Sequence, residues 1–185
     1  MSPGNASARL AVIGLAGAGK STCAGFIEEF AAARRLTHAR VKLATPLYEL
    51  QEQVYGATGR ALSPGVQDQV LMEALAQQLR RINSRSLVDN FLRRLAQAHV
   101  DVVLTDDLRD PHVDAPALQG CGFKILRIVC DEPIRRDRLA RRGDPTLTDG
   151  STAELHLIRP DAVIDSGCGI RCYRDRIEDV LLRWL

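Results

Sequence analysis

The sequence contains no hydrophobic run that approaches the roughly 20 residues a membrane-spanning helix needs. Its first residues also lack the basic and apolar segments of a secretory signal peptide. These two absences predict a cytoplasmic protein. The net charge of +2 gives no reason to expect nucleic acid or a membrane surface as a partner, because such partners attract proteins with a large positive charge.

Paired cysteines are missing as well. The five cysteines include no Cys-x-x-Cys pair, and Cys168 and Cys172, which lie four residues apart, have no second pair with the spacing of a zinc site. The four histidines show no ligand spacing either. We therefore expect free thiols, and neither a disulfide framework nor a structural metal site.

Lysine is scarce in this chain. Of the 25 basic residues, 22 are Arg and only Lys20, Lys42 and Lys124 are Lys. A general coding preference for arginine is one explanation. The other is that some of the arginines hold phosphate groups, because a planar guanidinium can bind two oxygens at once.

Strand and helix patterns alternate along the chain, whose 45% hydrophobic and 26% charged residues are ordinary for a globular protein. The alternation predicts an α/β protein with a five-stranded parallel sheet and helices on both faces. One domain, 1–185, is expected, with a helical insert at 46–98 and an arginine-rich arm at 131–158. The expected strands are 9–13, 39–44, 101–105, 124–129 and 162–164, and the expected helices are 20–35, 47–55, 66–81, 85–98, 114–119, 131–142, 152–157 and 171–184.

Residues 14–21 read Gly-Leu-Ala-Gly-Ala-Gly-Lys-Ser and match the phosphate-binding pattern G-x-x-x-x-G-K-[ST] at every fixed position. Glycines at these places let backbone N–H groups surround phosphate oxygens, while Lys20 reaches the outer phosphates and the Ser21 hydroxyl binds Mg²⁺. A glycine-rich turn that binds nothing is the alternative. The expected nucleotide-binding residues are Gly14, Ala16, Gly17, Ala18, Gly19, Lys20, Ser21 and Thr22.

A phosphate-binding loop of this kind occurs in switch GTPases, in ATPases and in small-molecule kinases. The guanine-reading patterns D-x-x-G and N-K-x-D are both absent from the sequence, and large ATPases need a longer chain. A helical insert and an arginine-rich arm are typical of a kinase that closes over two substrates, because closure keeps water from the transferred phosphoryl group.

A pair of carboxylates follows the expected strand 101–105, in the segment Asp106-Asp107-Leu-Arg109. The carboxyl ends of parallel strands face the ligand crevice, so this is a suitable place for Mg²⁺ and for a proton acceptor. We assign Asp106 to the metal and Asp107 to catalysis, with the reverse order as one alternative and a capping pair as another. Arg109 lies at the same edge and can hold the phosphate of an acceptor.

Arginine is concentrated at residues 135–142, where five of eight positions are Arg. Arg135, Arg138 and Arg142 fall on one stripe of the expected helix. Arg138 and Arg142 are therefore candidates for neutralising the transferred phosphoryl group. A solvent-exposed helix face, with acidic residues as ion-pair partners, is the alternative.

Three segments together resemble the phage-type deoxynucleoside monophosphate kinases. Residues 42–48 (Lys-Leu-Ala-Thr-Pro-Leu-Tyr) resemble the F-A-x-P-L-K segment of that family, and residues 107–109 resemble its D-x-R. Residues 160–167 resemble its closing strand D-x-V-I-x-N-x-G. The chain departs from the family pattern at Leu43, where Phe is usual, and at Tyr48, where Lys is common.

The resemblance implies a three-layer P-loop kinase fold with strand order 2-3-1-4-5. It also implies that ATP and Mg²⁺ are cofactors and that the γ-phosphoryl group passes to a nucleoside monophosphate. The expected acceptor-binding residues are Lys42, Arg80 and Arg109. Because the departures fall on the acceptor side, a modified nucleotide or another phosphate acceptor stays open, as do a kinase of the dephospho-CoA or sugar-acid type and a non-catalytic ATP-binding module. Small-molecule nucleotides are the expected partners of a monomer or homodimer.

Lys20→Ala is expected to remove roughly 3–4 kcal/mol of transition-state stabilisation, because it deletes a charge aimed at the transferred phosphoryl group. The ratio of kcat/KM values in an ADP-release assay measures this loss. Lys124→Ala removes a lysine outside the motif and serves as the control. Equal activity of the two variants would contradict the assignment of Lys20.

Overall fold

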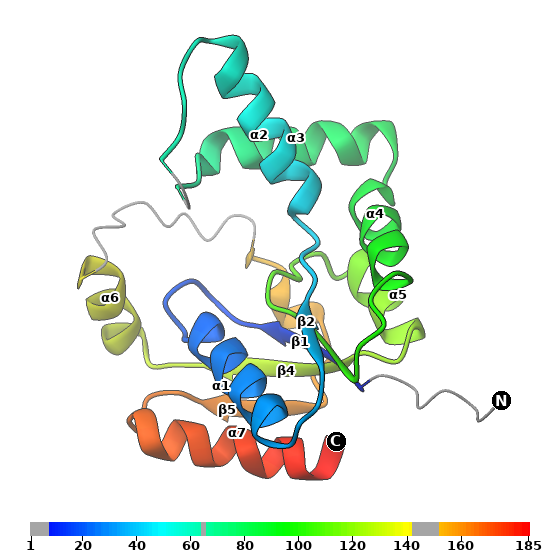
Figure 1. The fold of residues 1–185 in the computed structure, drawn as a ribbon. Helices are drawn as coiled ribbons and strands as arrows, with labels where there is room; N and C mark the ends of the chain where they lie inside the picture. Colours follow the sequence, from blue (N-terminus) through cyan, green and yellow to red (C-terminus); the bar gives the residue numbers. More distant parts are fainter. Residues whose placement is uncertain (1–7, 64–65, 142–151) are drawn as a thin grey trace, which may run out of the picture.

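The computed structural model describes residues 8–63, 66–141 and 152–185 (Figure 1). Its strands lie at one level of the molecule, and helices pack on both sides of them. In chain order the elements are β1 (Ala8–Ile13), α1 (Lys20–Ala33), β2 (His38–Arg40), α2 (Thr45–Ala57), α3 (Gln69–Ile82), α4 (Ser86–Leu95), β3 (Val102–Thr105), α5 (Asp114–Gly120), β4 (Lys124–Val129), α6 (Glu132–Arg141), the 3₁₀ helix η2 (Leu155–Leu157), β5 (Ala162–Asp165) and α7 (Ile170–Trp184).

The five strands form one parallel sheet in the order β2-β3-β1-β4-β5, which confirms the predicted topology. β1 is the central strand, and Leu10 lies opposite Leu104 on one side and Lys124 on the other. The loop that follows β1 therefore leaves from the middle of the carboxyl edge of the sheet, which is where α/β proteins bind their ligands.

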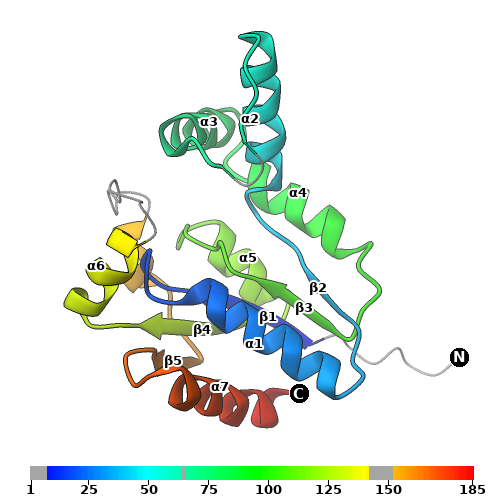
Figure 2. The same cartoon turned by 60° about the vertical axis from the view of Figure 1, so that its left-hand side comes forward.

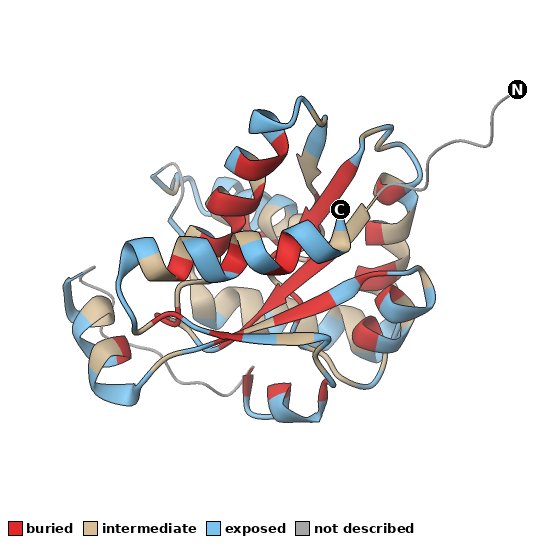
Figure 3. Ribbon diagram, turned by 90° about the horizontal axis from the view of Figure 1, so that it is seen from below, coloured by how far each residue is buried: buried red, intermediate tan, exposed pale blue. Residues whose placement is uncertain are grey.

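Both faces of the sheet are buried, as the continuous apolar strands predict. Leu10 and Val12 of β1 point to a core beneath α1 and α7, whereas Ala11 and Ile13 point to a core beneath α4 and α5. Figure 3 shows the resulting pattern, with buried residues on the strands and on the inward faces of these helices. Because the side chains of β1 alternate between the two faces, Leu10 and Val12 pack against α1, the helix that follows the glycine-rich loop.

Three helices, α2, α3 and α4, are inserted between β2 and β3. α4 packs on the sheet through Val88 and Phe91, both fully buried. α2 and α3 extend away from the sheet (Figure 2), and α3 has no buried residue. In the described parts of the chain, no helix combines the length and the apolar character needed to cross a membrane.

Three local predictions differ from the structure. β2 covers only His38–Arg40 instead of 39–44, and the helix expected at 152–157 is reduced to the short η2. The free thiols expected at Cys168 and Cys172 are wrong, because these residues form a disulfide across the start of α7. The other three cysteines are free. The second half of the expected arm, including Arg142, lies outside the described residues.

Phe91→Ala is expected to lower the free energy of unfolding by about 3–5 kcal/mol, because a fully buried ring would leave a cavity. The ring packs against Phe123, with their centroids 5.6 Å apart. Urea unfolding measures the change. Val70 on α3 is 80% exposed, so Val70→Ala is the control and should change stability by less than about 0.5 kcal/mol. A small loss in the Phe91 variant would show that this core can collapse around the gap.

Candidate nucleotide and acceptor sites

The glycine-rich segment forms a tight loop between β1 and α1, here called the P-loop (residues 14–21). Gly17 (φ +77°) and Gly19 (φ +104°) have left-handed backbone conformations that residues with a side chain rarely adopt. Gly19 is the N-cap of α1, and no side chain caps the helix. The first N–H groups of α1 are therefore open to an anion, and the exposed Ser21 hydroxyl lies in the same first turn.

Six consecutive carbonyl groups of the P-loop each accept a hydrogen bond from a side chain. Lys20 Nζ donates to the carbonyls of Gly14 (2.8 Å) and Leu15 (3.0 Å). The remaining donors are Arg135 to Ala16 (3.0 Å), Arg138 to Gly17 (3.5 Å), Ser166 to Ala18 (2.7 Å) and Tyr173 to Gly19 (3.1 Å). These carbonyls are held by the protein, and Ala18 N–H also bonds within the loop, to the Leu15 carbonyl (3.1 Å). The first N–H groups of α1 remain for a ligand.

Helix α6 packs directly on the P-loop. A Cβ atom at Gly17 would lie 2.8 Å from Leu139 Cγ and 3.0 Å from atoms of Arg135, so only glycine fits there. Arg135 is buried and is also held by both oxygens of Glu132 (2.7 and 2.9 Å). Hydrogen bonds from Arg135 and Arg136 lower the pKa of Glu132 to about 2. The sequence placed Arg135 on the arginine stripe of this helix but gave it no role of its own. In the structure, Arg135 joins α6 to the P-loop.

The turn after β5 closes the other side of the P-loop. Arg138 donates to the Ser166 hydroxyl (2.8 Å) and to the Ser166 carbonyl (2.9 Å). Tyr173, at the start of α7, is buried beside Phe26, and burial raises the pKa of its hydroxyl. Sequence reasoning missed Ser166 and Tyr173, because neither belongs to the loop pattern and both reach it from the other end of the chain.

Asp106, expected near the metal, is buried at the end of β3. One of its oxygens, Oδ2, lies 3.3 Å from Arg40 Nη1, while the other, Oδ1, is buried and has no hydrogen-bond partner. Burial raises the pKa of Cys23 on α1 to about 12, and the charge of Asp106 contributes to that rise. Asp106 therefore lies within electrostatic reach of the first turn of α1, which carries Ser21.

These oxygens fit Mg²⁺. The ion takes oxygen ligands and is usually bound through one or two protein groups together with the phosphates of a nucleotide. Ser21 Oγ and the unpartnered Oδ1 of Asp106 are such groups. Among the described residues, no group of three or more His, Cys, Asp or Glu side chains could hold a metal without a nucleotide.

Asp107 has a different environment from the one expected for a proton acceptor. Its Oδ1 accepts hydrogen bonds from Leu43 N (3.0 Å) and Thr105 Oγ1 (2.9 Å), and its Oδ2 accepts one from Ala44 N (2.9 Å). The carboxylate is therefore used to hold the connection from β2 to α2 against the end of β3. The sequence could not reveal this role, since Leu43 and Ala44 lie more than 60 residues from Asp107.

Arg80 is also used within the protein. It lies on α3 and pairs with Asp110 (3.1 Å) and Asp114 (2.6 Å), which links α3 to the start of α5. Burial raises the pKa of Asp114 to about 6, although the charge of Arg80 opposes the rise. Arg109 is exposed on the loop between these acidic residues and Asp107.

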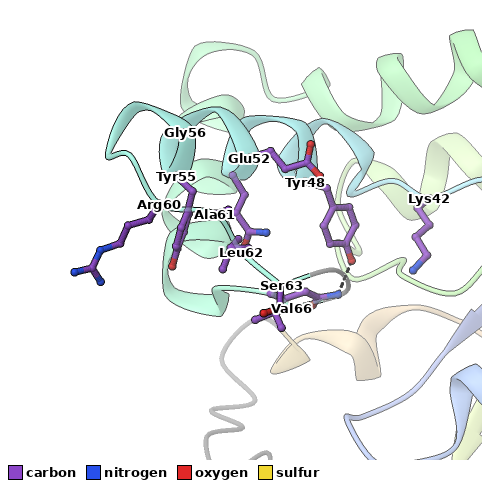
Figure 4. Close-up of a pocket in the computed structure, with 12 residues that line it drawn as sticks. Lys42, Tyr48, Glu52, Tyr55, Gly56, Arg60, Ala61, Leu62, Ser63 and Val66 are labelled. Atoms are coloured by element: carbon purple, nitrogen blue, oxygen red, sulfur yellow. Dashed lines mark hydrogen bonds between the residues drawn. The ribbon is translucent and has the colours of Figure 1, made fainter.

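A pocket of about 570 Å³ lies between α2 and the segment that follows it (Figure 4). Its lining residues are Lys42, Tyr48, Gln51, Glu52, Tyr55, Gly56, Arg60, Ala61, Leu62, Ser63, Val66 and Gln67. Lys42 stands at the end nearest the sheet, with its Nζ 5.8 Å from the centre of the Tyr48 ring. Burial and the charge of Asp107 raise the pKa of Tyr48, while Arg109 lowers it, so the pocket adjoins the Asp-Leu-Arg segment.

The connection that carries Lys42 is fixed by α4. Arg94 donates to the Lys42 carbonyl (2.6 Å) and to Thr45 Oγ1 (2.9 Å). Together with the hydrogen bonds that Asp107 accepts from Leu43 N and Ala44 N, this sets the direction in which α2 leaves the sheet. No local pattern in the sequence distinguishes Arg94 from the other arginines of the insert.

Comparisons with known proteins support the fold. No family model matches the chain, and no curated protein matches it. Among solved structures, TT1252 from Thermus thermophilus is similar, with a TM-score of 0.59, 16% identity, and coverage of 97% of this chain and 98% of that one. A shikimate kinase from Acinetobacter baumannii in complex with shikimate has a TM-score of 0.57 and 12% identity, and the match covers 97% of this chain and 93% of that one. A gluconokinase from Sinorhizobium meliloti has a TM-score of 0.52 and 13% identity, and the match covers 97% of this chain and 94% of that one.

The chain has the fold of the P-loop kinases. Identities this low carry the fold and nothing more specific. No comparison places the chain among the phage-type deoxynucleoside monophosphate kinases, so that resemblance stays a prediction.

The raised pKa of Asp114 predicts how stability depends on pH. Between about pH 4 and pH 6 the folded chain keeps a proton on Asp114 that the unfolded chain releases near its ordinary pKa of 3.8. Stability from this group is therefore present at low pH and is lost as pH rises through about 6. Asparagine cannot ionise, so the free energy of unfolding of the Asp114→Asn variant, relative to that of the wild type, should rise by about 2 kcal/mol between pH 4 and pH 7.

Urea unfolding at a series of pH values measures this difference. Asp175→Asn, at an exposed aspartate of α7, is the control for the loss of one carboxylate. A difference in stability between the Asp114 variant and the wild type that does not change with pH would contradict the raised pKa.

Proposed function

We propose that the protein is an ATP-dependent kinase that transfers the γ-phosphoryl group to a nucleoside monophosphate, most suitably a deoxynucleoside monophosphate. The observation that carries the proposal is the pocket beside Lys42, which has tyrosines on its walls and a cation at the end that faces the sheet. An acceptor with a planar base and a phosphate group matches that arrangement, because aromatic rings pack on a base and a cation holds a phosphate.

The two candidate sites lie at the same edge of the sheet. β2 is two strands away from β1 in the sheet, and two strand spacings are roughly 10 Å. Lys42 follows β2, and the P-loop follows β1, so both lie beyond the same carboxyl edge. A transfer from a nucleotide in the P-loop to an acceptor near Lys42 and Arg109 requires such a placement.

The basic character of the acceptor side supports a charged acceptor. Lys42 follows β2, and Arg109 follows β3. An acidic D-x-D pattern, which would accept hydrogen bonds from the hydroxyl groups of a sugar-like acceptor, is absent from this position. The helices at 46–98 would then form the acceptor-binding part of the protein.

Each residue has a distinct part in the proposed reaction. The N–H groups of the P-loop bind the nucleotide phosphates, and Lys20 stabilises charge on the transferred group. Arg109 and Lys42 hold the acceptor phosphate, while Arg138 reaches the P-loop rim from α6 and can neutralise charge there. Mg²⁺, held by Ser21 and Asp106, supplies further neutralisation of the phosphate charges when it is bound.

Two of the expected roles change in this proposal. Asp107 fixes the connection to α2 and does not accept the proton, because its oxygens are already occupied by three donors. Arg80 holds α3 on α5 and does not bind the acceptor. α6 covers the P-loop and excludes water from one side of it, which is the part of the proposed lid that the described residues contain.

A kinase for a small hydroxy acid is the second candidate. The fold similarity to a shikimate kinase and a gluconokinase extends over nearly the whole chain, and both names denote kinases of carboxylic acids. Lys42 and Arg60 in the pocket can bind a carboxylate as well as a phosphate. The acceptor assay therefore includes both acids.

ADP release is expected to depend on the acceptor when the protein is incubated with ATP, Mg²⁺ and a panel of nucleoside and deoxynucleoside monophosphates, shikimate and gluconate. We expect turnover with at least one monophosphate, because the pocket combines aromatic walls with a cation. A coupled assay measures the rate, and chromatography of the product shows whether a diphosphate has formed.

The outcomes separate the candidates. Turnover with shikimate or gluconate alone would support the hydroxy-acid kinase. Tight ATP binding without turnover on any acceptor would sink both and leave a nucleotide-binding module. Arg60 lies at the far end of the pocket from Lys42. If an acceptor is found, Arg60→Ala should weaken the binding of that acceptor more than the binding of ATP.

A further inference from the structure

Asp106 is the end of a chain of three charged side chains that begins on α1. Glu28 on α1 accepts two hydrogen bonds from Arg40, at 3.0 Å from Nε and 2.8 Å from Nη2. The third nitrogen of the same guanidinium, Nη1, lies 3.3 Å from Asp106 Oδ2. The planar group is thus fixed on one carboxylate and presents its remaining donor to the other.

The two oxygens of Asp106 have unequal surroundings. Oδ2 faces Arg40, whereas Oδ1 is buried without any hydrogen-bond partner. The side chain is only 8% exposed, so water does little to compensate for the missing partner. A buried carboxylate oxygen left in this state costs free energy, which a bound cation or its water would offset. Oδ1 is therefore the oxygen that is prepared for a ligand.

We propose that Arg40, held by Glu28, is a positioning residue that fixes Asp106 so that Oδ1 is presented to the Mg²⁺ of the bound nucleotide. The inference rests on the proposed function in one respect, the use of Mg²⁺ with ATP. Without Arg40 the carboxylate can rotate and exchange its two oxygens, and its burial no longer has a compensating charge.

Arginine is suited to this place for a geometric reason. Its fork contacts two oxygens of Glu28 and one of Asp106 from a single planar group. A lysine ammonium is one compact point of charge and cannot span these three oxygens at once. Partners that orient a metal-binding group commonly change metal affinity by about 10–100-fold when they are removed.

The test measures the Mg²⁺ enhancement of ADP binding, defined as the ratio of the ADP dissociation constants without and with Mg²⁺. Isothermal titration calorimetry gives both constants for the full chain. Arg40→Met is expected to lower the enhancement by about tenfold. The dissociation constant of ADP without Mg²⁺ should hardly change, which a general loss of structure would not allow.

A double-mutant cycle asks whether Arg40 acts through Asp106. In an Asp106→Asn background, Arg40→Met should produce no further loss of enhancement, because the group that it positions is gone. Arg174→Met is the matched control, since Arg174 pairs at 2.6 Å with Glu29, the neighbour of Glu28 on α1. If Arg40→Met fails to fold, Arg40→Lys keeps the charge and should still lower the enhancement.

Each outcome decides the inference. An unchanged or larger enhancement in the Arg40 variants, or an undiminished effect in the Asp106→Asn background, overturns it while leaving the proposed kinase intact. If the wild type binds ADP with the same dissociation constant with and without Mg²⁺, both this inference and the metal part of the proposed function are overturned. A lost enhancement in a protein that phosphorylates none of the monophosphates supports the inference and rejects only the proposed acceptor.

Discussion

The structure depends on how the carbonyl groups of one glycine-rich loop are satisfied. Every carbonyl from Gly14 to Gly19 accepts a side-chain hydrogen bond, and four of these six hydrogen bonds come from α6, the turn after β5, or α7. With these carbonyls held by side chains, the first N–H groups of α1 are left over, and backbone groups of this kind are suited to an anion. The close fit of α6 on Gly17 follows from the same constraint.

The proposed acceptor side is built on the same principle, with a carboxylate in place of the arginines. Asp107 and Arg94 bind the backbone on both sides of Leu43, so the direction of α2 is set by residues of β3 and α4. The pocket beside Lys42 therefore has a defined position relative to the P-loop. The two neighbouring aspartates at the end of β3 have different roles. Asp107 accepts hydrogen bonds from backbone N–H groups, whereas Oδ1 of Asp106 has no hydrogen-bond partner.

Much of the fold could be predicted from the sequence, because its signals are local. The apolar strands, the intervening helical periodicity and the glycine-rich pattern gave the sheet, its topology through the resemblance, and the place of the P-loop. The predicted ends of strands were wrong where a contact with a distant part of the chain determines where the strand ends. The last N–H group to pair with β3 is that of Val41, which donates to the Leu104 carbonyl, and the N–H groups of Leu43 and Ala44 donate to Asp107 instead. The disulfide of Cys168 and Cys172 was missed because spacing shows which cysteines are near in the chain and not how a turn orients them.

The sequence by itself determined the phosphate-binding loop, since a flexible backbone, a lysine and a hydroxyl at fixed spacing are a local requirement. It could not distinguish one arginine from another. Arg135, Arg138, Arg80, Arg94 and Arg40 look alike in a sequence with 22 arginines, yet each meets a different oxygen in the folded chain. Only the tertiary structure decided these roles, because the partner of a long charged side chain is chosen by the packing of elements that are far apart in the sequence.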